Sequence, residues 1–319
     1  MGPIENSLHS SQTMRQLSIF SALLAVLVIV GANFFCYSRT LNAYFLADDF
    51  IHIAYLSEVF SGHPEKLLEN FTGNWMQAWG TQFYRPFISL TLALDFALGQ
   101  GNPLIFHISN TLFQSACSVF IFFITRRLLS ASFLPQQQYI TALAAGLFFA
   151  VCPLHTEVVS WVIGRVDSVC LAFSLAAFYY YLVYRESKSK KSLYGSLSCF
   201  VISLLSKEMA VILPPLIVLY ELFFAEARSL TERCKIAAKA SMSYFLVLLG
   251  YLGVRTLALG TLQGGYGGSI GESLTNSLPQ RLSSLSKLFF PFNNEAIPPF
   301  DRLQKYILSL YRVSCLVLL

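Results

Sequence analysis

Two long uncharged runs constrain the fold of this chain more than any other feature. Residues 16–38 and residues 103–125 each span 23 positions without Lys, Arg, Asp or Glu. A helix needs about 20 predominantly apolar residues to cross the hydrocarbon core of a bilayer. Across the 319 residues, 55% are hydrophobic and 12% are charged, whereas about 25% of residues are charged in an ordinary soluble domain. The sequence therefore predicts an all-α polytopic membrane protein.

Six weaker apolar stretches predict further membrane helices. They cover residues 139–152, 168–184, 192–206, 209–224, 240–254 and 306–319. Together with the two long runs they predict a bundle of about eight transmembrane helices. The first long run exceeds the apolar core of a signal peptide, which has about 7 to 15 residues, so we expect it to be retained as the first helix.

Basic residues predict which connections face the cytoplasm. They cluster at Arg126-Arg127, at residues 185–191 and at residues 228–239, and short cytoplasmic loops are enriched in Lys and Arg. Residues 87–99 carry Asp95 and are short for a span, so we expect them to form an in-plane helix at the membrane interface. The predicted exterior loops are then residues 39–102, 153–167, 207–208 and 255–305.

Ionisable side chains gather on this predicted exterior side. They are Asp48, Asp49, Arg85, His155, Glu157, Arg165, Asp167, Lys207 and Glu208. Charged groups at membrane depth are costly and usually face the interior of a bundle or a water-filled cavity. A one-sided collection of both signs therefore predicts a polar active site at the exterior face.

The sequence predicts neither a metal site nor a nucleic-acid site. The seven cysteines include no CxxC pair, and His155 and Glu157 lack the spacing of the HExxH zinc motif. The net charge of +5 comes from basic residues in short loops between apolar spans. No cofactor is predicted, and binding of a divalent cation is left open.

Each charged motif has two interpretations. Asp48 and Asp49 either cap the N-terminus of the following amphipathic helix or supply a general base with a raised pKa. Arg85 either anchors a helix at the interface or binds a phosphate. Lys207 and Glu208 either form an aqueous turn or place Lys207 against a lipid-linked phosphate.

Three further polar features carry the same ambiguity. Residues 153–167 are either two helix ends tied by ion pairs or part of the site. His107, Asn110 and Gln114 share one face of a span, where interhelical hydrogen bonding is the simplest role. Asn70-Phe71-Thr72 is an acceptor sequence for N-glycosylation, which has meaning only in a secretory lumen.

Six segments keep a fixed order and spacing within residues 44–222. They are ADDF (47–50), YRPFISLTLALDFALG (84–99), NPLIFHISNTLF (102–113), RRLL (126–129), CPLHTEVVSWVIGRVDSV (152–169) and SKEMAVILPPLIVLYEL (206–222). In these segments the chain resembles the multi-pass glycosyltransferases of the GT-C superfamily. It is most similar to the protein O-mannosyltransferase-like branch that includes the transmembrane-and-TPR proteins and their bacterial relatives.

The resemblance implies a GT-C-type helical bundle with an exterior active site. Such an enzyme moves a sugar, mannose among the candidates, from a polyprenyl-phosphate donor to a hydroxyl of a protein or glycan acceptor, with inversion. By position, Asp48 and Asp49 would supply the base, and Asp48 is favoured. Arg85, His155, Arg165 and Lys207 would hold the donor phosphate or sugar, and Glu157, Asp167 and Glu208 would support them.

The resemblance also predicts the domain organisation. A catalytic membrane module is expected over residues 1–254, with its first exterior loop at 39–102. An exterior Gly-rich loop would follow at 255–305, and a further transmembrane helix would begin at 306–319. A bacterial inner membrane is favoured over the endoplasmic reticulum membrane, with the active face periplasmic or luminal.

Two departures from the family keep alternatives open. Cys152-Pro153 stands where relatives commonly have His-Pro, and the chain stops inside its eighth span, without later helices or TPR repeats. The first alternative is a truncated relative that binds lipid-phosphate without catalysis. The second is a transporter or flippase, although no inverted repeat is evident.

Overall fold

The computed structural model describes residues 3–77, 81–130, 132–227, 229–261 and 264–265. The chain divides into two compact units, Met1–Gly265 and Tyr266–Leu319, and every described residue belongs to the first. The predicted Gly-rich loop beyond residue 265 and the predicted helix at 306–319 therefore lie outside the described residues.

The first unit is helical, and its described residues include no β-strand. The long helices are α1 (Pro3–Cys36), α5 (Pro103–Leu128), α6 (Pro135–Val151), α8 (Arg165–Ser187), α9 (Lys190–Leu204), α10 (Leu213–Phe224) and α11 (Leu230–Leu259). The connections hold α2 (Asp49–Phe60), α3 (Glu65–Glu69), α4 (Pro86–Gly99) and α7 (Thr156–Ser160). They also hold the 3-10 turns η1 (Ser38–Asn42), η2 (Trp75–Gln77), η3 (Pro153–His155) and η4 (Glu208–Ile212).

Local chemistry sets several helix ends. Pro103 opens α5, and the Asn102 side chain accepts a hydrogen bond from Leu104 N at 3.0 Å, which satisfies one of the free amides of the first turn. The hydroxyl of Ser229 caps α11 in the same way. At the other end of α11, Gly260 has a φ of 70°, the left-handed conformation that commonly terminates a helix.

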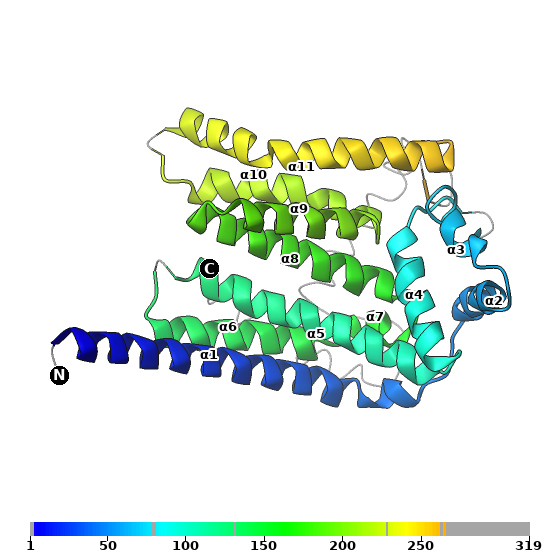
Figure 1. Cartoon of the computed structure of the whole chain (residues 1–319), viewed down its shortest axis with the longest axis horizontal. Helices are drawn as coiled ribbons and strands as arrows, with labels where there is room; N and C mark the ends of the chain where they lie inside the picture. Colours follow the sequence, from blue (N-terminus) through cyan, green and yellow to red (C-terminus); the bar gives the residue numbers. More distant parts are fainter. Residues whose placement is uncertain (1–2, 78–80, 131, 228, 262–263, 266–319) are drawn as a thin grey trace, which may run out of the picture. The chain divides into compact units, whose positions relative to one another are not determined.

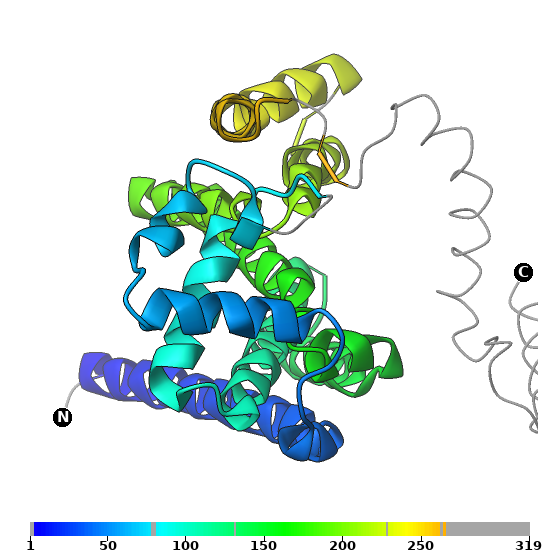
Figure 2. The ribbon, with the colours of Figure 1, turned by 90° about the vertical axis from the view of Figure 1, so that its right-hand side faces the viewer.

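The long helices run in alternating directions, so their connections collect at two ends (Figure 1). One end holds the connections α1–α5, α6–α8 and α9–α10 and the end of α11, and we call it the site end. Helices α2 and α4 lie across the site end (Figures 1 and 2). The opposite end holds the α5–α6, α8–α9 and α10–α11 connections, where the basic clusters lie. The described parts of the four predicted exterior loops therefore share one end.

Helix α5 lies at the centre of the packing. It contacts α1, α4, α6 and α8, and α8 in turn packs against α9. Gly146 permits the close approach of α6, because an added Cβ would lie 2.8 Å from Ile29 Cδ1 and 3.1 Å from the Ser118 carbonyl oxygen. Small residues at such crossings let membrane helices pack closely.

Length and composition identify fewer spans than the sequence predicts. Among the described helices, α5, α8 and α11 are long and apolar enough to cross a membrane, and a bent pair, α6 with Pro153–Ser160, would make a fourth. The apolar part of α1, Phe20–Cys36, and α4 are shorter apolar helices. Helices α9 and α10 have 15 and 12 residues, below the roughly 20 that a perpendicular span needs.

Polar side chains of α5 hold the connection between α6 and α8. Asn110 Nδ2 donates to the carbonyl oxygens of Val159, Trp161 and Val162 at 3.3, 3.0 and 3.3 Å. Gln114 Nε2 lies 2.8 Å from His155 Nδ1. The predicted hydrogen bonding is therefore seen for Asn110, whose three bonds reach α7 and the turn before α8, and it fixes the loop that faces the start of α2.

Candidate active site

The two adjacent aspartates occupy opposite environments. Asp49 is fully buried, whereas Asp48 is exposed. Asp49 Oδ2 accepts a hydrogen bond from Leu46 N at 2.9 Å, and Oδ1 accepts one from Ile163 N at 3.0 Å. Burial raises the pKa of the Asp49 carboxyl, although these amide hydrogen bonds oppose the shift. Asp49 therefore joins the start of α2 to the connection between α7 and α8.

The Asp48 side chain is left outside this network. Asp48 occupies the N-cap position of α2 but makes no capping hydrogen bond through its side chain. The preceding residue, Ala47, has a φ of 50°, a left-handed conformation that is costly for a residue with a Cβ. His52 Nδ1 lies 2.8 Å from the Asp48 carbonyl oxygen. The turn is thus fixed through its backbone, and the Asp48 carboxylate is held exposed at the site end.

His52 and Trp75 form a second, buried layer behind this turn. Because a carbonyl oxygen only accepts hydrogen bonds, His52 Nδ1 must carry the proton. Burial lowers the pKa of His52 against the opposing influence of that hydrogen bond and the aspartates. The His52 and Trp75 ring centroids are 4.7 Å apart, and His52 Nε2 and Trp75 Nε1 have no hydrogen-bond partner among the described residues. A water or a hydroxyl group could satisfy such atoms.

Arg85 rests on two aromatic rings and binds Glu208. Its guanidinium carbon lies 4.0 Å from the ring centroid of Phe83 and 5.2 Å from that of Trp75. Arg85 Nη2 donates to Glu208 Oε1 at 2.8 Å, and Nε donates to Oε2 at 3.4 Å. Burial raises the pKa of Glu208, but the charge and hydrogen bond of Arg85 outweigh it and hold the pKa below its ordinary value. We call Arg85, Phe83 and Trp75 the Arg85 platform.

The neighbouring Lys207 binds a different helix. Its Nζ lies 2.5 Å from Asp167 Oδ1, at the start of α8. Two residues earlier, the Leu205 carbonyl oxygen accepts a hydrogen bond from Phe87 N of α4 at 3.1 Å. The turn between α9 and η4 is therefore tied to both α4 and α8.

Arg165 lies inside the protein and faces other partners. Its side chain is fully buried, with Nη1 2.6 Å from Asp95 Oδ2. Its Nη2 donates to the Phe106 carbonyl oxygen at 3.1 Å. Asp95 Oδ1 in turn accepts a hydrogen bond from Ser109 at 2.6 Å. The guanidinium thus joins α8 to α4 and α5.

His155 and Glu157 are held apart from these ion pairs. The His155 ring packs against Phe149, with centroids 4.1 Å apart, and its Nδ1 lies 3.0 Å from the Phe149 carbonyl oxygen. Glu157 is exposed. Among the nine predicted residues, Arg85 binds Glu208 and Lys207 binds Asp167. His52 and Trp75 lie between Arg85 and the Asp48 backbone carbonyl.

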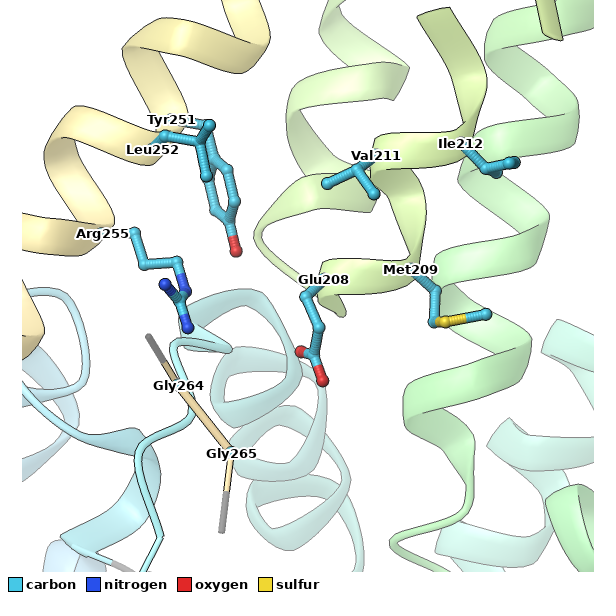
Figure 3. Close-up of a pocket in the computed structure, with 9 residues that line it drawn as sticks. All are labelled: Glu208, Met209, Val211, Ile212, Tyr251, Leu252, Arg255, Gly264 and Gly265. Atoms are coloured by element: carbon cyan, nitrogen blue, oxygen red, sulfur yellow. The ribbon is translucent and has the colours of Figure 1, made fainter. Parts of the chain in front are cut away.

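An open, largely apolar cavity of about 580 Å³ lies beside Glu208. Figure 3 shows Tyr251 and Arg255 on its α11 wall and Glu208 on the η4 wall. The Tyr251 hydroxyl is buried without a hydrogen-bond partner among the described residues. The volume falls in the range of small-molecule sites, about 300–1,000 Å³. The complete lining is Glu208, Met209, Val211, Ile212, Tyr251, Leu252, Arg255, Gly264 and Gly265.

Gly264 and Gly265 close this cavity on one side. Gly265 pairs with Gln82 through two backbone hydrogen bonds of 2.8 and 2.9 Å. A Cβ on Gly264 would overlap the Arg255 guanidinium and would lie 2.6 Å from the Gln82 carbonyl oxygen. The backbone contact favours glycine at this close approach. The start of the Gly-rich segment therefore lies directly against an arginine.

Sequence reasoning missed three residues of this region. Arg255 ends an apolar helix on the predicted exterior side, which is the same signal that singled out Arg85. His52 follows the aspartate pair by one helical turn, so its ring could have been placed beside them. Trp75 gave no sequence signal, because it reaches the site through a turn.

The site contains no recognisable metal centre within the part of the chain that the structure describes. No group of three or more His, Cys, Asp or Glu side chains there could hold a metal ion. The polar groups present include the exposed Asp48 carboxylate, the ion pairs Arg85–Glu208 and Lys207–Asp167, and Arg255 on the wall of the largely apolar cavity. This donor set suits an anionic, hydroxyl-bearing ligand.

Fold and site together define an all-α membrane protein with a polar site at one end of its bundle. A family model described as dolichyl-phosphate-mannose-protein mannosyltransferase matches residues 85–252. This match covers more than half of the 319 residues, and the chain belongs to that family. The matched region begins at Arg85 and includes Lys207 and Glu208, while the aspartate pair precedes it.

Curated relatives carry a related name. Protein O-mannosyl-transferase TMTC3 of Mus musculus is 30% identical over 228 residues, which cover 67% of this chain and 23% of the relative. Protein O-mannosyl-transferase Tmtc1 of Drosophila melanogaster is 32% identical over 191 residues, or 56% of this chain and 20% of the relative. The chain thus spans about a quarter or less of these relatives. No solved structure shows a significant match.

Proposed function

We propose that the chain is a membrane glycosyltransferase that moves mannose from a polyprenyl-phosphate donor to a hydroxyl group of a protein acceptor. The observation that carries the proposal is the juxtaposition at the site end. Asp48, whose carboxylate is exposed, contacts His52 through its backbone carbonyl oxygen, and His52 packs against Trp75 of the Arg85 platform. Arg85 in turn binds the Glu208 side chain, which lines an open apolar cavity. The family and the names of the relatives support the same reaction.

Asp48 is the general base in this proposal, and Asp49 positions it. Both Asp49 oxygens already accept backbone hydrogen bonds, so its carboxylate is committed to the fold. Asp48 has an exposed side chain with no capping hydrogen bond. A base must reach within about 3 Å of the proton that it removes, and only an accessible carboxylate can do so.

The cavity beside Glu208 receives the donor in this proposal. Its apolar walls suit the start of a polyprenyl chain, and Arg255 and the buried Tyr251 hydroxyl, which has no hydrogen-bond partner among the described residues, suit the phosphate. Asp48 takes the proton of the acceptor hydroxyl as the oxygen attacks C1 of the sugar. The bond from C1 to the phosphate oxygen breaks, and the lipid phosphate leaves with the electron pair. Attack opposite to the leaving group inverts the configuration at C1.

Arginine charge supports the departure of the phosphate. Arg255 lines the α11 wall of the cavity, and Arg85 binds Glu208 on the η4 wall. Preorganised cations that meet developing charge lower a barrier effectively. Arg165 is proposed to hold the scaffold, because Asp95 and Phe106 occupy its guanidinium. His155 and Glu157 remain candidates for contacts with the sugar or acceptor.

The bundle is proposed to cross the membrane several times with the site end outside. The basic connections at the opposite end support a cytoplasmic location for that end. Helices α2 and α4, which lie across the site end (Figure 2), are then the in-plane helices of the exterior face. A periplasmic or luminal active face follows from this orientation.

One experiment separates this enzyme from a lipid-phosphate binder and from a flippase. The full chain is reconstituted in liposomes with radiolabelled polyprenyl-phosphate-mannose and a Ser/Thr-containing acceptor peptide. We expect label to move to the peptide, and we expect this transfer to saturate with donor. Binding of the donor without transfer would support the non-catalytic relative, and movement of intact donor between leaflets without transfer would support a flippase. Either result would overturn the proposal.

A further inference from the structure

The acceptor asparagine of the N-glycosylation sequence Asn70-Phe71-Thr72 is buried in this structure. Asn70 is 1% exposed, although it lies in a connection that the sequence predicts to be an exterior loop. Its side-chain nitrogen donates to the Tyr55 hydroxyl at 3.0 Å and to the carbonyl oxygens of Lys66 and Leu67 at 3.0 and 3.2 Å. A glycan on this nitrogen would replace these contacts and would not fit the buried position.

The side-chain oxygen of Asn70, Oδ1, is paired as well. It accepts hydrogen bonds from Met76 N at 2.6 Å and from the Ser89 hydroxyl at 2.9 Å. Ser89 is itself fully buried on α4. One amide side chain therefore joins α2, α3, η2 and α4, which together form the connection across the site end. A buried amide with all its groups paired fixes a unique arrangement of its neighbours.

The bond to Met76 holds a strained turn. Met76 has a φ of 45° and Gln77 has a φ of 53°, two successive left-handed residues that both carry side chains. Such conformations persist only where surrounding contacts impose them. The Asn70 oxygen supplies the hydrogen bond at the first of the two residues.

The strained turn places the Trp75 ring against the Arg85 guanidinium. Trp75 N donates to the Phe83 carbonyl oxygen at 2.9 Å, and the Trp75 and Phe83 rings both support the Arg85 guanidinium. Displacing Met76 would move the adjacent Trp75 and hence one of the two rings of the Arg85 platform. Thr72, the other determinant of the acceptor sequence, is exposed, and its hydroxyl donates to the Glu69 carbonyl oxygen in the same connection at 3.4 Å.

We propose that Asn70 is a positioning residue that fixes the Arg85 platform, and that its acceptor sequence stays unmodified in the folded protein for that reason. The effect on sugar transfer rests on the proposed function, whereas the structural role and the absence of a glycan do not. Asn70 acts through Met76, Trp75 and Arg85, and it does not touch the substrate.

The test compares Asn70→Asp with Thr72→Ala. Both changes destroy the acceptor sequence, but only the first removes the amide donor and places a carboxylate against two carbonyl oxygens. Hydrogen-exchange mass spectrometry on the detergent-solubilised full chain should show faster exchange of residues 74–77 and 83–89 in Asn70→Asp. Thr72→Ala should match the wild type. Equal exchange in the two variants would overturn the proposal.

Kinetics and a second variant extend the test. The kcat/KM of Asn70→Asp for the donor should fall about tenfold or more, mainly through kcat, because a displaced Arg85 no longer meets the charge that develops on the departing phosphate. Should Asn70→Asp fail to fold, Ser89→Ala removes a single bond and must still speed exchange at residues 85–89; unchanged exchange there contradicts the inference.

The acceptor sequence has a readout of its own. In a glycosylating eukaryotic host, peptide mass spectrometry of the folded fraction should find Asn70 without a glycan. A glycan on Asn70 in the folded fraction would contradict the proposal that this residue is buried and unmodified. Exchange and glycan mapping require no transfer, so a wild type without transferase activity would overturn the proposed function alone.

Discussion

At Asp49, burial and amide hydrogen bonds act in opposite directions on one carboxyl group. Burial raises its pKa more than the bonds from Leu46 and Ile163 lower it. The adjacent Asp48 has neither constraint on its side chain. Asp49 thus holds the turn, whereas the carboxyl of the neighbouring Asp48 is exposed. The two adjacent aspartates look alike in the sequence, so this difference could not be predicted from it.

The raised pKa of Asp49 predicts a dependence of stability on pH. The folded state holds this proton more tightly than the unfolded chain, so the contribution to stability is greatest below the ordinary value of 3.8. It is lost as the pH rises from there through the raised pKa. Asn at this position does not titrate. We therefore expect the free energy of unfolding of Asp49→Asn to fall less with rising pH than that of the wild type, measured by denaturant titration in detergent. The same pH dependence of the free energy of unfolding in Asp49→Asn and the wild type would contradict a raised pKa of Asp49.

The buried pair Arg165 and Asp95 predicts a large effect on stability. Removing one partner leaves an uncompensated charge in the interior, which costs about 3–5 kcal/mol. We expect Arg165→Met to lower the free energy of unfolding by this amount, and Asp95→Leu combined with Arg165→Met to recover part of the loss. Thermal unfolding in detergent measures both. A neutral Arg165→Met that raises only the donor KM would instead support the phosphate-binding role expected from the sequence.

At the scale of elements, the turn before α8 depends on Gly164. A Cβ there would lie 3.0 Å from the carbonyl oxygens of Glu157 and Trp161. Both are backbone atoms, which move less easily than the end of a side chain. We expect Gly164→Ala to destabilise the protein by about 1–3 kcal/mol and to displace the Ile163 amide from Asp49. Gly250 is the matched control, because a Cβ on it meets nothing within 4 Å. Gly250→Ala should be neutral or stabilising by up to about 1 kcal/mol; equal losses would contradict the packing.

Sequence periodicity and composition predict the long helices but not the residues at which they begin and end. The helix expected at 240–254 extends over Leu230–Leu259, because its charged first turns continue the same backbone hydrogen bonding. The contacts that define the site could not be predicted. Asp49 meets Ile163 and Arg85 meets Glu208 across more than 110 residues, and only the packing of α5 with its neighbours brings such segments together.

At the scale of the whole molecule, the charge pattern predicts which polar segments share one end. The number of spans does not follow from composition alone, since helices as short as α9 and α10 cross only where the bilayer thins or flanking side chains snorkel. The orientation remains a prediction.

Two exposed cysteines test the orientation. Cys36 ends α1 at the site end, and Cys234 lies near the start of α11 at the opposite end. In sealed vesicles with the native orientation, a membrane-impermeant maleimide should label Cys36 and leave Cys234 unlabelled until detergent is added. Cys36→Ser and Cys234→Ser identify the two signals. Labelling of both residues in sealed vesicles would contradict a bundle that crosses the membrane between them.

The central claim, that Asp48 removes the acceptor proton, is tested most directly by single-turnover transfer from saturating labelled donor. The rate constant of Asp48→Asn is compared with that of the wild type, and donor binding is measured on the same preparations. The account predicts a loss of about 100- to 10,000-fold in the rate constant with donor binding retained. A single-turnover rate constant equal to that of the wild type would contradict it.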